Sequence, residues 1–128
     1  MNEDALNETL AQWKNAVDRL GEAVAEKSPS QLMIDGTIQR FEFTFELSWK
    51  AMQKILRVKE DIDVPSPKQT LQKAYRLEWI DDEDLWVRML KDRNMTSHTY
   101  KQELAKEIYG RIKTYYPEFV KLYEKLGE

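Results

Sequence analysis

Apolar residues recur every three or four positions along most of the chain, and this spacing constrains its fold more than any other feature. The longest run comprises Ile34, Ile38, Phe41, Phe45, Trp49, Met52 and Leu56. Shorter runs lie within residues 6–24, 71–75, 85–89 and 104–115. This period places the apolar side chains on one face of an α helix. The sequence therefore predicts an all-α bundle of about five helices.

Polar residues and prolines indicate where these helices begin and end. Residues 60–65 predict a loop, and the following Ser66-Pro67-Lys68-Gln69 predicts a helix start with a serine cap and proline in the first position. The acidic run at residues 81–84 predicts another start, because carboxylates complement the positive end of a helix dipole. Pro117 predicts that the last long helix ends or kinks, followed by a short terminal helix over residues 119–126.

Composition narrows the classes of function. The 128 residues fit a single domain over positions 1–128. With no cysteine and one histidine, neither a disulfide framework nor a zinc site is expected, and no cofactor is implied. The net charge of −3 argues against an extended nucleic-acid surface but leaves room for a local phosphate site. No apolar run is long enough for a membrane span and the first residues do not resemble a signal peptide, so a cytoplasmic protein is expected.

The segment from Lys91 to Tyr100 carries the residues best suited to chemistry. It contains the single histidine, His98, with Arg93 five residues before it. Histidine transfers protons near neutral pH, and the planar guanidinium of arginine suits phosphate oxygens. Together they could support metal-free attack of a ribose hydroxyl on the neighbouring phosphate, with Arg93 stabilising the developing charge. The two residue types alone are more often found in an ordinary surface or capping role.

Helix geometry limits how these two side chains could cooperate. On one unbroken helix Arg93 and His98 would lie about 140° apart. Either the helix breaks between them or the site is shared between subunits. The polar residues 94–97 permit a break, with Thr96 or Ser97 capping the next helix. A homodimer would supply a second His98, which is useful because this cleavage needs one group to accept a proton and another to donate one.

Other polar and aromatic residues have simpler interpretations. The side chains at positions 41, 45 and 49 are expected in the core. Glu42 and Glu46 are like charges one turn apart, for which a solvated face or a bridge to Lys50 is expected. Tyr115 and Tyr116 could stack on bases, but packing around the nearby proline is the favoured prediction.

Two segments give a resemblance to a known family. Residues 93–100, RNMTSHTY, resemble the R-x-x-x-x-H-x-Y motif of HEPN proteins paired with minimal nucleotidyltransferases. Residues 35–50, DGTIQRFEFTFELSWK, resemble the same family's characteristic segment, and the resemblance extends over essentially the whole chain. It implies a HEPN-like up-and-down helical bundle that forms homodimers. It also implies an RNase centre of Arg93 and His98, with Asn94 matching the polar residue commonly found after the arginine.

The same resemblance implies a partner, a minimal nucleotidyltransferase antitoxin that transfers AMP from ATP to Tyr100. The leading hypothesis is therefore a toxin of a type II or VII-like toxin–antitoxin pair. It would be a metal-independent endoribonuclease, acting on RNA and neutralised by AMPylation of Tyr100. A non-catalytic module that binds a nucleotidyltransferase is the first alternative, and a plain helical interaction domain is the second.

Overall fold

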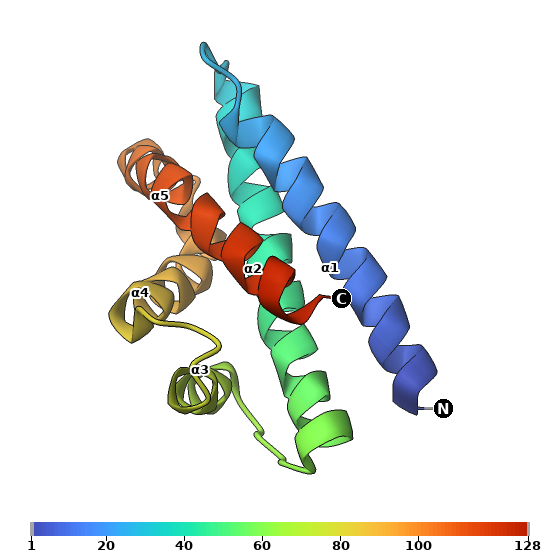
Figure 1. Ribbon diagram of the computed structural model, residues 1–128. Coiled ribbons are helices and arrows are strands. Elements are labelled where there is room, and N and C mark those ends of the chain that lie inside the picture. Colours follow the sequence, from blue (N-terminus) through green and yellow to red (C-terminus); the bar gives the residue numbers. More distant parts are fainter. Residues whose placement is uncertain (1, 128) are drawn as a thin grey trace.

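A computed structural model of the protein describes residues 2–127 (Figure 1). Over these residues the chain forms five α helices and one short 3-10 helix and no strand. They are α1 (Asn2–Val24), α2 (Gln31–Glu60), α3 (Pro67–Arg76), α4 (Glu83–Asn94), η1 (Thr96–His98) and α5 (Gln102–Leu126). The prediction of an all-α bundle of about five helices is confirmed.

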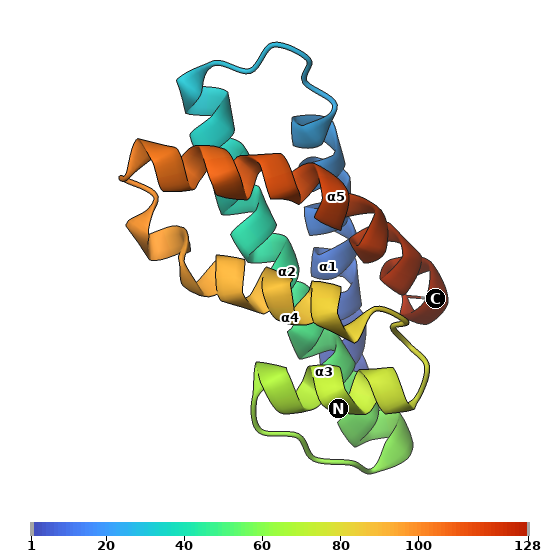
Figure 2. The ribbon, with the colours of Figure 1, turned by 90° about the vertical axis from the view of Figure 1, so that its left-hand side faces the viewer.

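Helix α2 is the central element of the bundle. It pairs lengthwise with α1 in an antiparallel hairpin, closed at one end by residues 25–30 (Figure 1). In Figure 2 the helices α3, α4 and α5 lie one above another across α2, and each of them contacts it. The 3-10 segment η1 also contacts α2. A helix with this many neighbours presents a different face to each of them.

The core includes buried aromatic rings from four helices, packed among aliphatic side chains. These rings are Trp13, Phe41, Phe45, Trp86, Tyr115 and Phe119. Phe41 stacks on Tyr115 with ring centroids 5.6 Å apart, and Trp86 meets Phe119 edge to face at 5.4 Å. Such pairs contribute about 0.5–1.5 kcal/mol each beyond the burial of their area. The predicted core positions at 41 and 45 are confirmed, and position 49 packs against the core half-buried.

The predicted helix starts at α3 and α4 are confirmed. The Oγ of Ser66 accepts a hydrogen bond from the backbone N–H of Gln69 at 3.2 Å, and Pro67 is the first residue of α3. At α4 the carboxylate of Asp82 accepts from the N–H of Leu85 at 3.0 Å. The acidic run at residues 81–84 therefore acts as a helix start.

The sequence predicts that Pro117 either ends or kinks the last long helix. The first outcome, an end with a separate terminal helix beyond it, is wrong. Helix α5 continues through Pro117 without interruption. A proline inside a helix removes one backbone hydrogen bond and crowds the preceding turn. Here the flanking side chains Tyr115 and Phe119 are both buried in the core, and their packing holds the helix together across the proline. Tyr115 is therefore a core residue, as the packing interpretation predicted.

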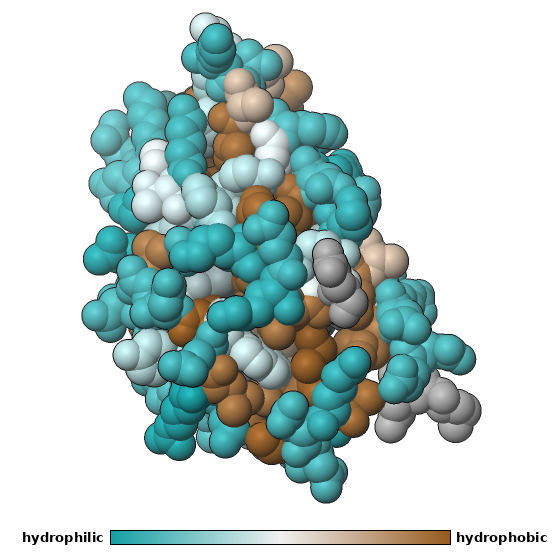
Figure 3. Space-filling model, in the orientation of Figure 1, coloured by the Kyte–Doolittle hydropathy of each residue, from teal (hydrophilic) through white to brown (hydrophobic). Residues whose placement is uncertain are grey.

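The outer surface is largely polar. The face shown in Figure 3 is mostly hydrophilic, with apolar side chains visible between the helices. Among the helices described here, none combines the length and the apolar composition that a membrane crossing requires.

A buried carboxylate joins α4 to α5. Asp92, with 5% of its surface exposed, accepts hydrogen bonds from Arg111 Nε at 2.7 Å and from Arg111 Nη2 at 2.9 Å. The hydroxyl of Tyr115 donates to the same carboxylate at 2.6 Å. Burial of this phenol, together with its hydrogen bond to Asp92, raises the pKa of Tyr115. The arrangement fixes the end of α4 immediately before Arg93.

We predict that Asp92→Asn lowers the free energy of unfolding by about 1.5–3 kcal/mol, because hydrogen bonds to a charged acceptor are lost. Urea denaturation, monitored by circular dichroism, measures this change in the free energy of unfolding. Tyr115→Phe is the matched control and should cost about 1 kcal/mol, since Asp92 keeps its paired arginine. An Asp92→Asn protein that unfolds at the same urea concentration as the parent would contradict this account.

Candidate functional site

The site begins where α4 ends, at a break in the helical backbone. Helix α4 stops at Asn94, and the single 3-10 turn of η1 follows. The Thr96 hydroxyl donates to the Arg93 carbonyl at 2.7 Å, and the Thr99 hydroxyl donates to the Thr96 carbonyl at 2.8 Å. Threonine side chains commonly form such local bonds and compete with helix continuation. The predicted break between Arg93 and His98 is thus confirmed.

The predicted role of Thr96 or Ser97 as the cap of the next helix is wrong. Helix α5 begins only at Gln102, and Lys101, which precedes it, provides no side-chain cap. The Thr96 hydroxyl bonds backwards to α4 instead of forwards. Tyr100 consequently lies before α5 and not in its first turn.

Arg93 is anchored to the central helix. Its Nη2 donates to the Glu46 carboxylate of α2, and its Nη1 donates to Asn94 Oδ1 at 3.2 Å. The Arg93 Nε is buried and has no hydrogen-bond partner. Glu46 also pairs with Lys50, Nζ to Oε2, at 3.2 Å. Of the two ion pairs of Glu46, the one with Lys50 was expected from helical spacing.

The pair between Arg93 and Glu46 was not predicted. The two residues are 47 positions apart, and no local pattern connects them. The only sequence signal was the unfavourable proximity of two glutamates on α2, which calls for a cation nearby. Partial burial acts to raise the pKa of Glu46, but Lys50, the neighbouring Trp49 indole and Arg93 outweigh it and hold that pKa below its ordinary value.

His98 and Tyr100 lie together on the exposed side of the break. Their ring centroids are 6.2 Å apart in an edge-to-face arrangement. The Tyr100 side chain is prominent, with 76% of its surface exposed. Within residues 2–127 the His98 imidazole forms no hydrogen bond, so both ring nitrogens are open to an incoming group.

The four residues singled out from the sequence therefore form two pairs. Arg93 contacts Asn94, and His98 faces Tyr100. In the part of the chain described here no hydrogen bond joins one pair to the other, although α2 contacts both α4 and η1. The arrangement offers a fixed cation and an exposed imidazole within one short segment, which suits binding and proton transfer at a phosphate.

The carboxylate that precedes Arg93 in the sequence, Asp92, already has hydrogen-bond partners on both of its oxygens. These partners are Arg111 and Tyr115. In residues 2–127 no three His, Cys, Asp or Glu side chains are grouped as they would be around a metal ion.

Comparison with known proteins places the chain in a family. Residues 8–128 match the family described as nucleotidyltransferase substrate binding protein like. The chain belongs to this family. The resemblance to HEPN proteins associated with nucleotidyltransferases is thereby confirmed, and so is the HEPN-like fold class.

Relatives of this family member include a curated protein and two solved structures. The chain is 40% identical over 100 residues to Probable ribonuclease HepT of Haemophilus influenzae, an alignment covering 75% of this chain and 68% of that protein. A crystal structure from Thermus thermophilus has a TM-score of 0.85 and 34% identity, covering 89% of this chain and 98% of the other. A Haemophilus influenzae structure, described as the fold of a substrate binding domain of a nucleotidyltransferase, has a TM-score of 0.67 and 32% identity, covering 98% of each chain.

The Glu46 ion pairs give a pH-dependent prediction. The pKa of Glu46 is lower in the folded protein than its unfolded value of 4.5. The stabilisation that the ionised carboxylate gives the fold is therefore complete above pH 4.5 and is lost as the pH falls through the folded pKa. We expect Glu46→Gln to be less stable than the parent by about 1 kcal/mol at neutral pH. This difference should shrink as the pH is lowered through the folded pKa of Glu46, where the parent carboxylate becomes protonated too. Chemical denaturation of both proteins across this range measures it, and a difference that stays constant would contradict the assignment.

Proposed function

We propose that this protein is a metal-independent endoribonuclease, the toxin of a toxin–antitoxin pair. The observation that carries the proposal is the anchored guanidinium of Arg93 five residues before an exposed, unpaired His98, across a break in the helix. The similarity to Probable ribonuclease HepT supports the same activity. Arg93, His98 and Asn94 are the proposed catalytic residues.

In the proposed reaction a ribose 2′-oxygen attacks the adjacent phosphorus and the bond to the 5′-oxygen breaks. The 2′-hydroxyl proton passes to a base, and the leaving 5′-oxygen receives a proton from an acid. The Arg93 guanidinium stabilises the charge that develops on the phosphate oxygens, and Asn94 holds one edge of that guanidinium. One chain supplies one His98, so we propose a homodimer in which a second copy supplies the other proton-transfer group.

His98→Ala is expected to lower the rate of RNA cleavage about a hundredfold or more, which is the usual contribution of a proton-transfer group. Arg93→Ala is expected to lower it to a similar extent by removing charge stabilisation. Single-turnover cleavage of a labelled RNA measures both, and relief of growth inhibition in cells provides a second readout.

Arg88→Ala is a suitable control, because it removes an arginine from the same helix without entering the proposed centre. Circular dichroism confirms that each variant is folded. Cleavage should persist in EDTA. Parental rates in His98→Ala, or loss of activity in EDTA with recovery in magnesium, would refute the mechanism.

We further propose that a minimal nucleotidyltransferase antitoxin transfers AMP from ATP to the Tyr100 hydroxyl, releasing pyrophosphate. The exposure of Tyr100 supports this, because a partner enzyme must reach the phenol oxygen. Its ring faces His98, so an attached adenosine would block RNA from the imidazole. The negative phosphodiester would also compete for the cation that RNA phosphates need.

Incubation with ATP, magnesium and the cognate nucleotidyltransferase should raise the intact mass by one or more AMP units. Tyr100→Phe should abolish the first addition, since it removes the accepting oxygen while keeping the ring. Tyr109→Phe is the matched control and should still be modified, because its hydroxyl is buried. A Tyr100→Phe protein that is still modified and still silenced would show that another residue is the acceptor.

A second candidate function is a non-catalytic module that binds a nucleotidyltransferase. It is favoured by the description of the Haemophilus influenzae structure as a substrate binding domain of a nucleotidyltransferase. The two functions differ in one measurement. A binding module forms a complex with the nucleotidyltransferase but cleaves no RNA in its absence.

A further inference from the structure

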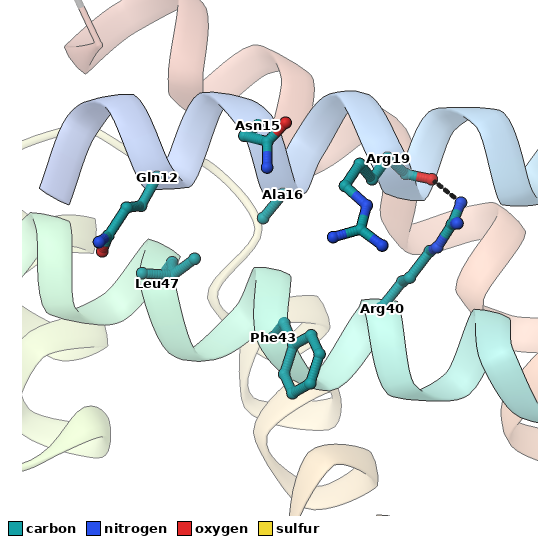
Figure 4. Close-up of a pocket in the computed structure, with 7 residues that line it drawn as sticks. All are labelled: Gln12, Asn15, Ala16, Arg19, Arg40, Phe43 and Leu47. Carbon is teal, nitrogen blue, oxygen red and sulfur yellow. Dashed lines mark hydrogen bonds between the residues drawn. The ribbon is translucent and has the colours of Figure 1, made fainter. Parts of the chain in front are cut away.

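A hollow lies between α1 and α2 (Figure 4). It has a volume of about 240 Å³. Its lining residues come from both helices of the hairpin and are Gln12, Asn15, Ala16, Arg19, Arg40, Phe43 and Leu47. The lining contains two arginines and no acidic residue, which is unusual in a chain with a net charge of −3.

The two arginines are free to receive an anion. Arg40 Nη1 donates to the backbone carbonyl of Arg19 at 2.8 Å, and this bond holds the Arg40 side chain across the gap between the helices (Figure 4). In the described part of the chain neither guanidinium pairs with a carboxylate. A guanidinium carries five N–H donors, so Arg40 keeps four and Arg19 keeps all of its own. Both groups stay charged at any physiological pH.

An aromatic ring lies beside these cations. Phe43 has 50% of its surface exposed and lines the same hollow as the two arginines, and in Figure 4 its ring projects from α2. Leu47, one turn further along α2, is half-buried next to it. Exposed aromatic rings combined with cationic groups are the features by which proteins bind single-stranded nucleic acid, through base stacking and phosphate contacts.

The hollow adjoins the proposed catalytic segment through α2. Phe43 lies one helical turn before Glu46, and Glu46 holds Arg93. Arg40 lies six residues before Glu46, about 9 Å along the helix axis. At about 100° per residue, Phe43 projects from α2 between the side that carries Arg40 and the side that carries Glu46. One strand of RNA held at Arg93 is therefore able to continue over Phe43 into the hollow.

We propose that this hollow is a binding subsite for single-stranded RNA. Phe43 stacks on a base outside the scissile bond, and Arg19 and Arg40 bind a backbone phosphate. The proposal rests on the proposed ribonuclease function and names how its substrate is held. Two unpaired guanidiniums favour a polyanion over a second copy of this chain, which would bring the same positive charges to the contact.

The test measures RNA binding without cleavage. In a His98→Ala background, fluorescence anisotropy of a labelled single-stranded RNA gives the affinity over a range of salt concentrations. Arg19→Gln should weaken binding several-fold. It should also lower the slope of log K against log salt concentration by about 0.7, which is the contribution of one phosphate contact on a single strand. Phe43→Leu should weaken binding about fivefold or more through lost stacking, with the salt dependence unchanged.

Arg57→Gln is the matched control, because it removes the same charge from α2 at a site that pairs with Asp63. It should bind RNA as the background protein does. Unchanged affinity in both hollow variants would overturn the proposal, as would a background protein that binds no RNA. A shift from dimer to monomer in sedimentation of Phe43→Leu would overturn it too, by identifying the surface as a contact between copies. Binding is measured separately from cleavage, so the two proposals can fail independently. If the hollow variants weaken RNA binding but the parent protein cleaves no RNA, the proposed nuclease activity is refuted and the proposed RNA subsite is supported.

Discussion

The position of Arg93 depends on the buried carboxylate of Asp92. A charge removed from water is costly unless its hydrogen bonds are complete, and Asp92 obtains three from Arg111 and Tyr115. These bonds fasten the last turn of α4 to α5. The next residue, Arg93, then reaches across to Glu46 on α2. Two consecutive residues thus connect three helices, and the cation of the candidate site is fixed by the same contacts that hold the bundle together.

The different faces of helix α2 make different contacts. One face supplies Phe41 and Phe45 to the core. A second face packs along α1, where the buried Thr44 hydroxyl donates to the carbonyl of Ala16 at 3.2 Å. A third carries Glu46, and the exposed strip beside it carries Phe43. Because a helix rotates about 100° per residue, neighbours in sequence belong to different surfaces, and a substitution on one face leaves the others largely intact.

The sequence predicts those features that depend on short-range patterns. Apolar spacing located the five helices, and capping residues placed the starts of α3 and α4. The predicted helix end at Pro117 is wrong because burial of Tyr115 and Phe119 outweighs the local backbone chemistry that favours an end there. The prediction at Thr96 is wrong because a threonine hydroxyl can either cap the helix that follows or hydrogen-bond to the helix that precedes it. The structure shows that it bonds back to α4.

The candidate site shows the same division. The motif identified Arg93, Asn94, His98 and Tyr100, and local spacing anticipated the pair of Glu46 with Lys50. Neither the motif nor the local spacing could reveal the contact of Glu46 with Arg93, which joins distant parts of the chain.

The break after α4 has a mechanical consequence as well. Residues 95–101 include no buried side chain, so local opening there costs few contacts while Arg93 stays fixed. One half of the candidate site is therefore fixed, whereas the half that carries the imidazole is able to move without disturbing the bundle.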